Sequence, residues 1–146
     1  MSNAATWQIT PATREETQIL DDKIFTFNQQ QVPFTQNPTP ILLNYVIKDQ
    51  NTIIAGIDAF LYHWNILFID VLFVEEAYRG QDLGSALLAH TENIALQLGS
   101  TLAHVDTFDF QAKDFYLKQG YTVFGTLQDC PPGHERYYLK KVLKTP

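Results

Sequence analysis

The chain has 146 residues, a formal net charge of −6, one cysteine (Cys130) and four scattered histidines. Its length and its 45% hydrophobic content predict a single globular domain over residues 1–146, and no apolar run approaches the roughly 20 residues of a membrane span. One cysteine excludes an internal disulfide and agrees with a cytoplasmic location, the histidines indicate no metal site, and the acidic balance disfavours nucleic acid and favours a cationic partner.

The first third of the chain is predicted to contain a short strand, a helix and a loop. Residues 1–4 look like the remnant of an expression tag. Thr13 and Glu16 have the spacing of a capping box, which predicts that a helix begins beside them. Three prolines in the segment that follows indicate a loop. The expected elements are a strand at residues 6–10, a helix at about 14–27 and a loop at 32–40.

Strands dominate the remainder, with helices between them only in the middle. Runs rich in apolar and β-branched residues are separated by short polar turns, and two segments have apolar residues at helical spacing. The expected strands are 41–48, 53–62, 66–74, 101–107, 121–127 and 136–143, and the expected helices are 83–98 and 111–119. This order predicts an α/β (α+β) fold, with a single mixed, mostly antiparallel sheet of about six to seven strands flanked by helices.

The turn at residues 79–84, Arg-Gly-Gln-Asp-Leu-Gly, lies between an apolar strand and a helix. The first N–H groups of a helix have no partner inside it, and the helix dipole places partial positive charge there. With Arg79 alongside, this turn can therefore bind a phosphate. The alternative is an ordinary strand-to-helix connection in which glycine only permits a tight turn.

The same turn resembles the acyl-CoA pyrophosphate loop of the GNAT superfamily of N-acetyltransferases. That pattern is Arg or Gln, two free positions, Gly, one free position, then Gly or Ala, and Arg79, Asp82 and Gly84 occupy its three specified places. A second family motif matches at Ala112, Phe115, Tyr116, Gly120 and Tyr121. Two positions depart from the patterns: Asp82 replaces a glycine, and Gln111 replaces a frequent asparagine. The resemblance covers roughly residues 40–143.

The resemblance implies an acyl-CoA N-acyltransferase fold and an acetyl-CoA-dependent enzyme without a metal. Such an enzyme transfers the acetyl group to a primary amine, here of a small molecule, by direct attack in a ternary complex. Many relatives form homodimers. The residues expected at the cofactor are Leu72, Phe73, Val74, Arg79, Gly80, Gln81, Asp82, Leu83, Gly84, Ser85 and Gln111.

Tyr116 is the expected general acid, because the family tyrosine at this place protonates the departing thiolate. The alternative is that Tyr116 only packs its helix onto the sheet. The attacking amine must also lose a proton. Period-two counting over 66–74 places Asp70 on one face with Ile66, Phe68, Leu72 and Val74, so Asp70 among apolar neighbours is the first candidate base.

Other candidates for the base remain open, namely Glu75 at the end of the same strand, and His104 and Asp106 on the next, acting through water. Cys130 and His134 are interpreted as loop residues. Two other classes of protein are also compatible with the sequence. One is a non-catalytic acyl-CoA-binding sensor or regulatory module, and the other is an α/β interaction domain without a cofactor.

Overall fold

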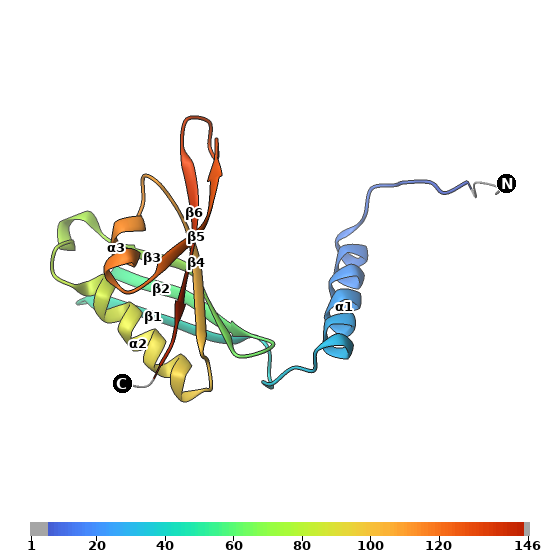
Figure 1. Ribbon diagram of the computed structural model, residues 1–146, viewed down its shortest axis with the longest axis horizontal. Coiled ribbons are helices and arrows are strands. Elements are labelled where there is room, and N and C mark those ends of the chain that lie inside the picture. The colour runs from blue at the N-terminus through green and yellow to red at the C-terminus, as the bar shows by residue number, and fades with distance from the viewer. Residues whose placement is uncertain (1–5, 145–146) are drawn as a thin grey trace. The chain divides into compact units, whose positions relative to one another are not determined.

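The computed structural model describes residues 6–144, so the expected tag remnant at 1–4 lies outside the described residues. The chain divides between Phe34 and Thr35 into two compact units, which are described separately. Figure 1 labels the helices and strands of both. No described helix combines the length and the apolar character needed to cross a membrane.

The first unit holds one helix, α1 (Arg14–Gln31), whose start follows the predicted capping box. The Thr13 hydroxyl accepts a hydrogen bond from the Glu16 N–H at 3.1 Å, and the Glu16 carboxylate accepts one from the Thr13 N–H at 2.9 Å. The helix continues beyond the predicted end because no residue before Pro33 removes a backbone donor or blocks the turn.

The strand expected at residues 6–10 is wrong, since this segment has no regular secondary structure. Trp7 and Ile9 are exposed there. A strand is stabilised by hydrogen bonds to a neighbouring strand, and the sheet is built entirely from residues after Phe34.

The second unit is one six-stranded mixed sheet in the order β1-β2-β3-β4-β6-β5. All strand pairs are antiparallel except β3 with β4, which α2 connects. This confirms the predicted fold class, and Figure 1 shows β5 and β6 extending as a hairpin. The elements are β1 (Ile41–Asp49), β2 (Thr52–Tyr62), β3 (Ile66–Val74), a 3-10 turn (Glu76–Tyr78), α2 (Leu83–Gln97), β4 (Leu102–Phe108), α3 (Lys113–Lys118), β5 (Thr122–Gln128) and β6 (Glu135–Val142).

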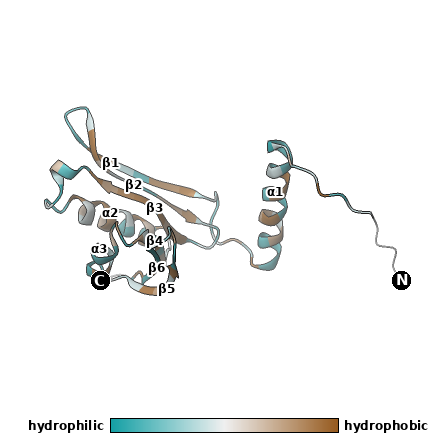
Figure 2. Ribbon diagram, turned by 90° about the horizontal axis from the view of Figure 1, so that it is seen from above, coloured by the Kyte–Doolittle hydropathy of each residue, from teal (hydrophilic) through white to brown (hydrophobic). Residues whose placement is uncertain are grey.

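One face of the sheet carries the hydrophobic core, which α2 and α3 cover. Leu61, Leu67, Ala103 and Leu139 from four strands are fully buried in this cluster, together with Leu88 of α2. Figure 2 shows α2 and α3 against the hydrophobic strands. Because side chains alternate along a strand, the residues between these buried ones lie on the opposite face of the sheet, which we call the far face.

A β-bulge at Asp70 changes the face of every later residue in β3. Ala59 pairs with Ile69, but the preceding Asp58 pairs with Val71, so Asp70 is an extra residue without a partner in β2. Phe68 therefore lies on the far face, whereas Leu72 packs against the core. Asp70 itself is exposed. The expectation that Asp70 lies among apolar neighbours on one face is wrong, because a bulge interrupts period-two counting.

Candidate active site in the opening between two strands

The central feature of the candidate site is the point where β3 and β4 separate. The two strands pair only from Ile66 with Leu102 to Ile69 with Val105, although β3 continues to Val74 and β4 to Phe108. The facing backbone edges beyond Ile69 and Val105 thus do not pair with each other. We call this space the wedge.

A cavity of about 860 Å³ occupies the wedge and reaches the start of α2. Its walls come from the ends of β3 and β4, the turn before α2, and α3. Tyr116 and Asp70 both line it. Gln81 does not line it. The expected cofactor residues that line it are Leu72, Phe73, Val74, Arg79, Gly80, Asp82, Leu83, Gly84, Ser85 and Gln111.

Arg79 is held at the end of the cavity by the backbone of β3. Its Nε donates a hydrogen bond to the Val74 carbonyl at 2.9 Å, and its guanidinium lies 5.8 Å from the centre of the Phe73 ring. Within residues 6–144 neither terminal nitrogen of Arg79 makes a hydrogen bond, so both can contact an anion. Since the N–H groups in the first turn of α2 also lack helical partners, the turn combines a fixed cation with free backbone donors.

Asp82 adopts the backbone conformation that explains why the family pattern has glycine there. It is the N-cap residue of α2, with φ at 62° in the left-handed region, and its side chain makes no capping hydrogen bond. Glycine enters this region without a steric cost, and aspartate is one of the few other residues that tolerate it. The departure from the motif therefore preserves the turn, but it adds a carboxylate to the cavity.

The second motif places α3 against the start of α2. A Cβ added at Gly84 would lie 3.4 Å from the Phe115 ring, an ordinary contact distance that agrees with the pattern's allowance for alanine. The Gln119 amide donates a hydrogen bond to the Ser85 hydroxyl at 3.1 Å. The two motifs, far apart in sequence, thus form adjoining walls of one cavity.

Tyr116 is 4% exposed and packs against the rings of Phe115 and Tyr121, at 5.2 Å and 5.4 Å between ring centres. Within residues 6–144, its hydroxyl takes part in no protein hydrogen bond, and the residue lines the cavity. Burial raises the pKa of the Tyr116 phenol far above its usual value, and the charge of Asp106 raises it further. The phenol therefore stays protonated, and Tyr116 is one of the residues that line the wedge cavity.

His104 and Asp106 lie on the far face of β4, because they alternate with the buried Ala103, Val105 and Thr107. The Tyr62 hydroxyl and His104 Nε2 are 2.7 Å apart. Burial lowers the pKa of His104, although the nearby Asp106 acts in the opposite direction, so this imidazole is neutral near pH 7. Arg136 donates a hydrogen bond from Nε to Asp106 Oδ1 at 3.0 Å.

A second cavity, of about 420 Å³, lies on the far face. Aromatic side chains dominate its walls, and the rings of Phe60 and Phe68 are 5.5 Å apart there. His104 closes one side, 5.0 Å from Phe68. Its lining residues are Thr39, Pro40, Phe60, Tyr62, His63, Phe68 and His104.

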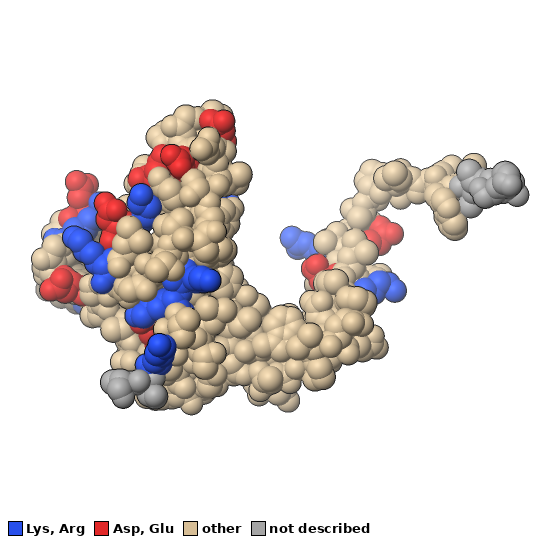
Figure 3. Space-filling view, viewed as in Figure 1, with Lys and Arg blue, Asp and Glu red and all other residues tan. Residues whose placement is uncertain are grey.

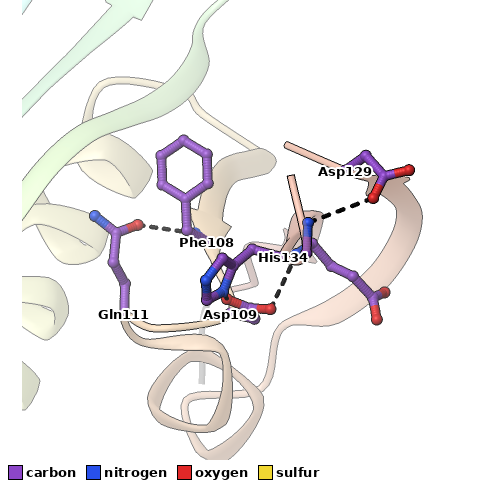
Figure 4. A network of polar contacts seen from close by, with 7 residues as sticks. Phe108, Asp109, Gln111, Asp129 and His134 are labelled. Atoms are coloured by element: carbon purple, nitrogen blue, oxygen red, sulfur yellow. Dashed lines mark hydrogen bonds and ion pairs between the residues drawn. The ribbon is translucent and has the colours of Figure 1, made fainter. Parts of the chain in front are cut away.

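Gln111 stabilises the turn after β4, as Figure 4 shows. Its Oε1 accepts hydrogen bonds from the Phe108 N–H at 2.8 Å and from the Thr107 hydroxyl at 3.2 Å. The amide oxygen is therefore occupied, whereas the amide nitrogen makes no hydrogen bond in the described part of the chain. The Gln111 amide oxygen therefore stabilises the turn and is not free to bind a ligand.

The loop between β5 and β6 is connected to the same turn. His134 Nδ1 lies 2.8 Å from an Asp109 carboxylate oxygen, and the other oxygen accepts the Glu135 N–H at 3.0 Å (Figure 4). His134 is thus a loop residue, as expected, with a structural partner. Cys130 lies in this loop too, and among residues 6–144 no group of three His, Cys, Asp or Glu side chains converges on a metal site.

Some cavity residues could not be identified from the sequence. Lys113 and Tyr137 both line the cavity, and the Lys113 ammonium lies 4.5 Å from the centre of the Tyr137 ring. Only the position of Lys113, directly after the matched Ala112, hinted at a role. The charges around α2 and α3 are of both signs and interspersed, as Figure 3 shows.

Comparisons with known proteins agree with this geometry. The model of the acetyltransferase (GNAT) family matches residues 5–121. A blasticidin-S acetyltransferase from Streptomyces morookaense is 33% identical over 73% of this chain and 78% of its own. The acetyltransferase Atu2258 from Agrobacterium fabrum is 34% identical over 68% of this chain and 72% of its own.

The fold comparison gives the same result. The crystal structure of an acetyltransferase from Bacillus cereus superposes with a TM-score of 0.87 at 32% identity, over 94% of this chain and 98% of that chain. The class of protein that the fold and the wedge define is an N-acetyltransferase. The chain belongs to the acetyltransferase (GNAT) family. This membership confirms the enzymatic prediction over the two non-catalytic alternatives.

Proposed function

We propose that this enzyme transfers the acetyl group of acetyl-CoA to a primary amine of a small cationic molecule, by direct attack in a ternary complex. The observation that carries this proposal is the single cavity that joins the anion-binding turn at Arg79 to the buried phenol of Tyr116. In this proposal acetyl-CoA is a co-substrate, and the chain supplies binding groups and proton-transfer groups.

The residues around the wedge fit such a co-substrate. The Arg79 guanidinium and the free N–H groups at the start of α2 suit a pyrophosphate. The edge of β3 from Leu72 to Val74 has no partner in β4, and its backbone groups other than the Val74 carbonyl, which accepts Arg79 Nε, can pair with an extended amide-containing arm as they would with a further strand. Together they orient the thioester toward Tyr116.

Tyr116 is proposed to donate its proton to the thiolate as the carbon–sulfur bond breaks. A thiol has a pKa of about 8.5, so a hydrogen bond from a phenol stabilises the negative charge that develops on sulfur. The proton of the attacking amine requires an acceptor on the other side of the wedge. Asp70, which lines the cavity and is exposed, remains a candidate for that role.

Three observations support a small cationic acceptor. The chain has a net charge of −6, and the far-face cavity has room for a small molecule. The relative from Streptomyces morookaense is named for blasticidin S, a small-molecule acceptor. We also propose a cytoplasmic location, which rests on the single cysteine, and a homodimer, which rests on the family resemblance alone.

The test combines binding and turnover. Acetyl-CoA at millimolar concentration is expected to raise the melting temperature and to give a calorimetric binding signal. An amine panel of blasticidin S, a polyamine, an amino sugar and a peptide with a free N-terminus is then screened for release of CoA thiol. We expect a small amine to gain one acetyl group by mass spectrometry. Binding without turnover of any amine, or turnover of the peptide alone, would contradict the proposal.

The carboxylate of Asp82 is expected to weaken co-substrate binding. Asp82→Gly should lower the dissociation constant of acetyl-CoA about fivefold, because repulsion between unit charges about 4 Å apart in water is on the order of 1 kcal/mol. Calorimetry at low ionic strength measures this change. Asp82→Asn separates the two possible causes, since it removes the charge but keeps a residue that tolerates the left-handed conformation. Wild-type affinity in both variants would show that the carboxylate points away from the ligand.

A further inference from the structure

Asp106 occupies a special position at the mouth of the wedge. It directly follows Val105, the last residue of β4 that pairs with β3, so it lies where the two strands begin to separate. Its side chain is on the far face, opposite to the core-facing Tyr116. Both residues nevertheless line the same cavity, which therefore passes between the strands.

The electrostatics connect the same two groups. The charge of Asp106 contributes to the raised pKa of the Tyr116 phenol, after the larger effect of burial. A carboxylate and a protonated phenol thus line the same cavity, and the charge of the first acts on the second. This is the geometry that acyl transfer needs, with a proton acceptor on the side of the attacking nitrogen and a proton donor on the side of the departing sulfur.

Arg136 of β6 fixes the Asp106 carboxylate from one side only. Its Nε and Nη2 both donate to Oδ1 of Asp106. The guanidinium lies 5.2 Å from the centre of the Phe108 ring and 5.5 Å from that of Tyr138, so aromatic contacts hold it in place. Within residues 6–144, Oδ2 of Asp106 takes part in no hydrogen bond. One oxygen is anchored and the other is available.

Asp70 lacks comparable support. It is the unpaired residue of the β-bulge, it is exposed, and in the described part of the chain neither of its carboxylate oxygens has a hydrogen-bond partner. An exposed, unanchored side chain loses conformational freedom when it binds, whereas Asp106 is already oriented. His104, two residues before Asp106 on the same face, contributes no competing positive charge when it is neutral.

We propose that Asp106 binds the ammonium group of the acceptor through Oδ2 and accepts a proton from its nitrogen during acetyl transfer, with Arg136 as the residue that positions the carboxylate. This inference rests on the proposed function and assigns to Asp106 the role first given to Asp70. Because Asp106 lies on the far face, the inference also requires that the acceptor amine enters the wedge from that face.

The proton and electron movements balance. The acceptor ammonium first releases one proton to solvent, and the nitrogen lone pair forms a bond to the thioester carbon. The carbon–sulfur bond then breaks, its electron pair remains on sulfur, and Tyr116 donates a proton to that sulfur. The nitrogen, positively charged after attack, passes a proton to Asp106, which returns it through solvent to the phenolate. The products are the N-acetyl amine, the CoA thiol and one proton.

The test compares carboxylate variants on the first amine that the wild-type enzyme acetylates. We expect Asp106→Asn to lower kcat/KM for that amine about 100-fold or more, with the KM for acetyl-CoA changed less than threefold, because an amide cannot accept the proton. Asp70→Asn should lose at least tenfold less activity than Asp106→Asn. Asp58→Asn, a far-face carboxylate outside the machinery, serves as the matched control and should retain wild-type kinetics.

The role of Arg136 has its own readout. Arg136→Lys should lower kcat/KM for the amine about tenfold, since a lysine cannot reproduce the two guanidinium donors that converge on Oδ1 of Asp106. In the double variant that also carries Asp106→Asn, Arg136→Lys should lower kcat/KM little further, because the effects of substituting residues that act together are not additive. Additive losses would contradict positioning through Asp106. Unchanged melting temperatures and an unchanged affinity for acetyl-CoA show that each variant folds. If Asp106→Asn does not fold, Asp106→Ser takes its place.

Three outcomes overturn the inference. If Asp106→Asn and Asp106→Ser keep wild-type kcat/KM while acetylation proceeds, Asp106 has no such role and the proposed function stands. If Asp70→Asn has the larger loss, the proton acceptor is Asp70. If the wild-type enzyme binds acetyl-CoA but acetylates no amine of the panel, the proposed function fails first, and this is seen before any variant is made.

Discussion

Tyr116→Phe is expected to lower kcat about 100-fold or more, while the affinity for acetyl-CoA changes little. The ring of Tyr116 packs in the core and phenylalanine preserves that packing, so the variant of this cavity-lining residue removes only the hydroxyl. Without this donor, the negative charge on the departing sulfur is no longer stabilised by the protein. Steady-state kinetics with the acetylated amine and calorimetry with acetyl-CoA measure the two quantities.

The pH dependence provides a second readout of the same residue. Because burial, followed by the charge of Asp106, raises the pKa of Tyr116 far above 10, its proton should not be lost at any pH at which the enzyme is assayed. The wild-type kcat is therefore expected to rise with pH as the amine deprotonates and then to level off. An alkaline fall in kcat that disappears in Tyr116→Phe would contradict the raised pKa.

Tyr121→Phe is the matched control for Tyr116→Phe. Both tyrosines are buried and their rings are in contact, but Tyr121 does not line the cavity. Tyr121→Phe should keep kcat within about threefold of wild type and lower the free energy of unfolding. Tyr116→Phe should lower kcat strongly and keep the free energy of unfolding close to that of wild type. If Tyr116→Phe retains wild-type turnover, Tyr116 only packs α3 onto the sheet.

Glu92→Ala is expected to lower the free energy of unfolding by about 3 kcal/mol, because it leaves two polar partners without a bond inside the protein. Glu92 of α2 is 8% exposed. One carboxylate oxygen accepts the Tyr121 hydroxyl at 2.7 Å, and the other accepts the Lys141 ammonium at 2.8 Å. These two hydrogen bonds connect α2 to Tyr121, which follows α3, and to Lys141 of β6. Their loss therefore affects the packing of α2 and of α3.

Urea unfolding of the wild type and the variants measures this change. Glu92→Gln should lose only about 1 kcal/mol, since an amide oxygen can still accept the Tyr121 hydroxyl. Glu76→Ala, a substitution of an exposed acidic residue, should stay within about 0.5 kcal/mol of wild type. If Glu92→Ala is as stable as this control, the buried network has no net stabilising effect.

Elements with strong local signals could be predicted from the sequence. The capping box of Thr13 and Glu16 has the predicted hydrogen bonds, and the strand expected at 66–74 coincides with β3. Apolar runs between polar turns predict strands well, because burial of both faces selects them. The end of α1 was harder to predict from the sequence, since polar residues up to Gln31 are compatible with either a helix or a loop.

Two local predictions were wrong for a shared reason. The segment 6–10 has strand-like composition but no strand partner, and Asp70 follows period-two counting only until the bulge. Strand pairing and bulges depend on which residues of another segment lie opposite, and these partners are distant in sequence. Periodicity describes one segment at a time and contains no information about register.

The sequence by itself determined the family and most of the cavity, because the turn at 79–84 and the motif around Tyr116 are local patterns with fixed spacing. Only the tertiary structure decided how Asp106 is placed. Its partner Arg136 lies 30 positions away, and the two meet because β4 and β6 pair in one particular register. Tyr116 approaches from the other face only because β3 and β4 separate there. Spacing along the chain selects the chemical groups, and long-range strand pairing determines which of them can act together.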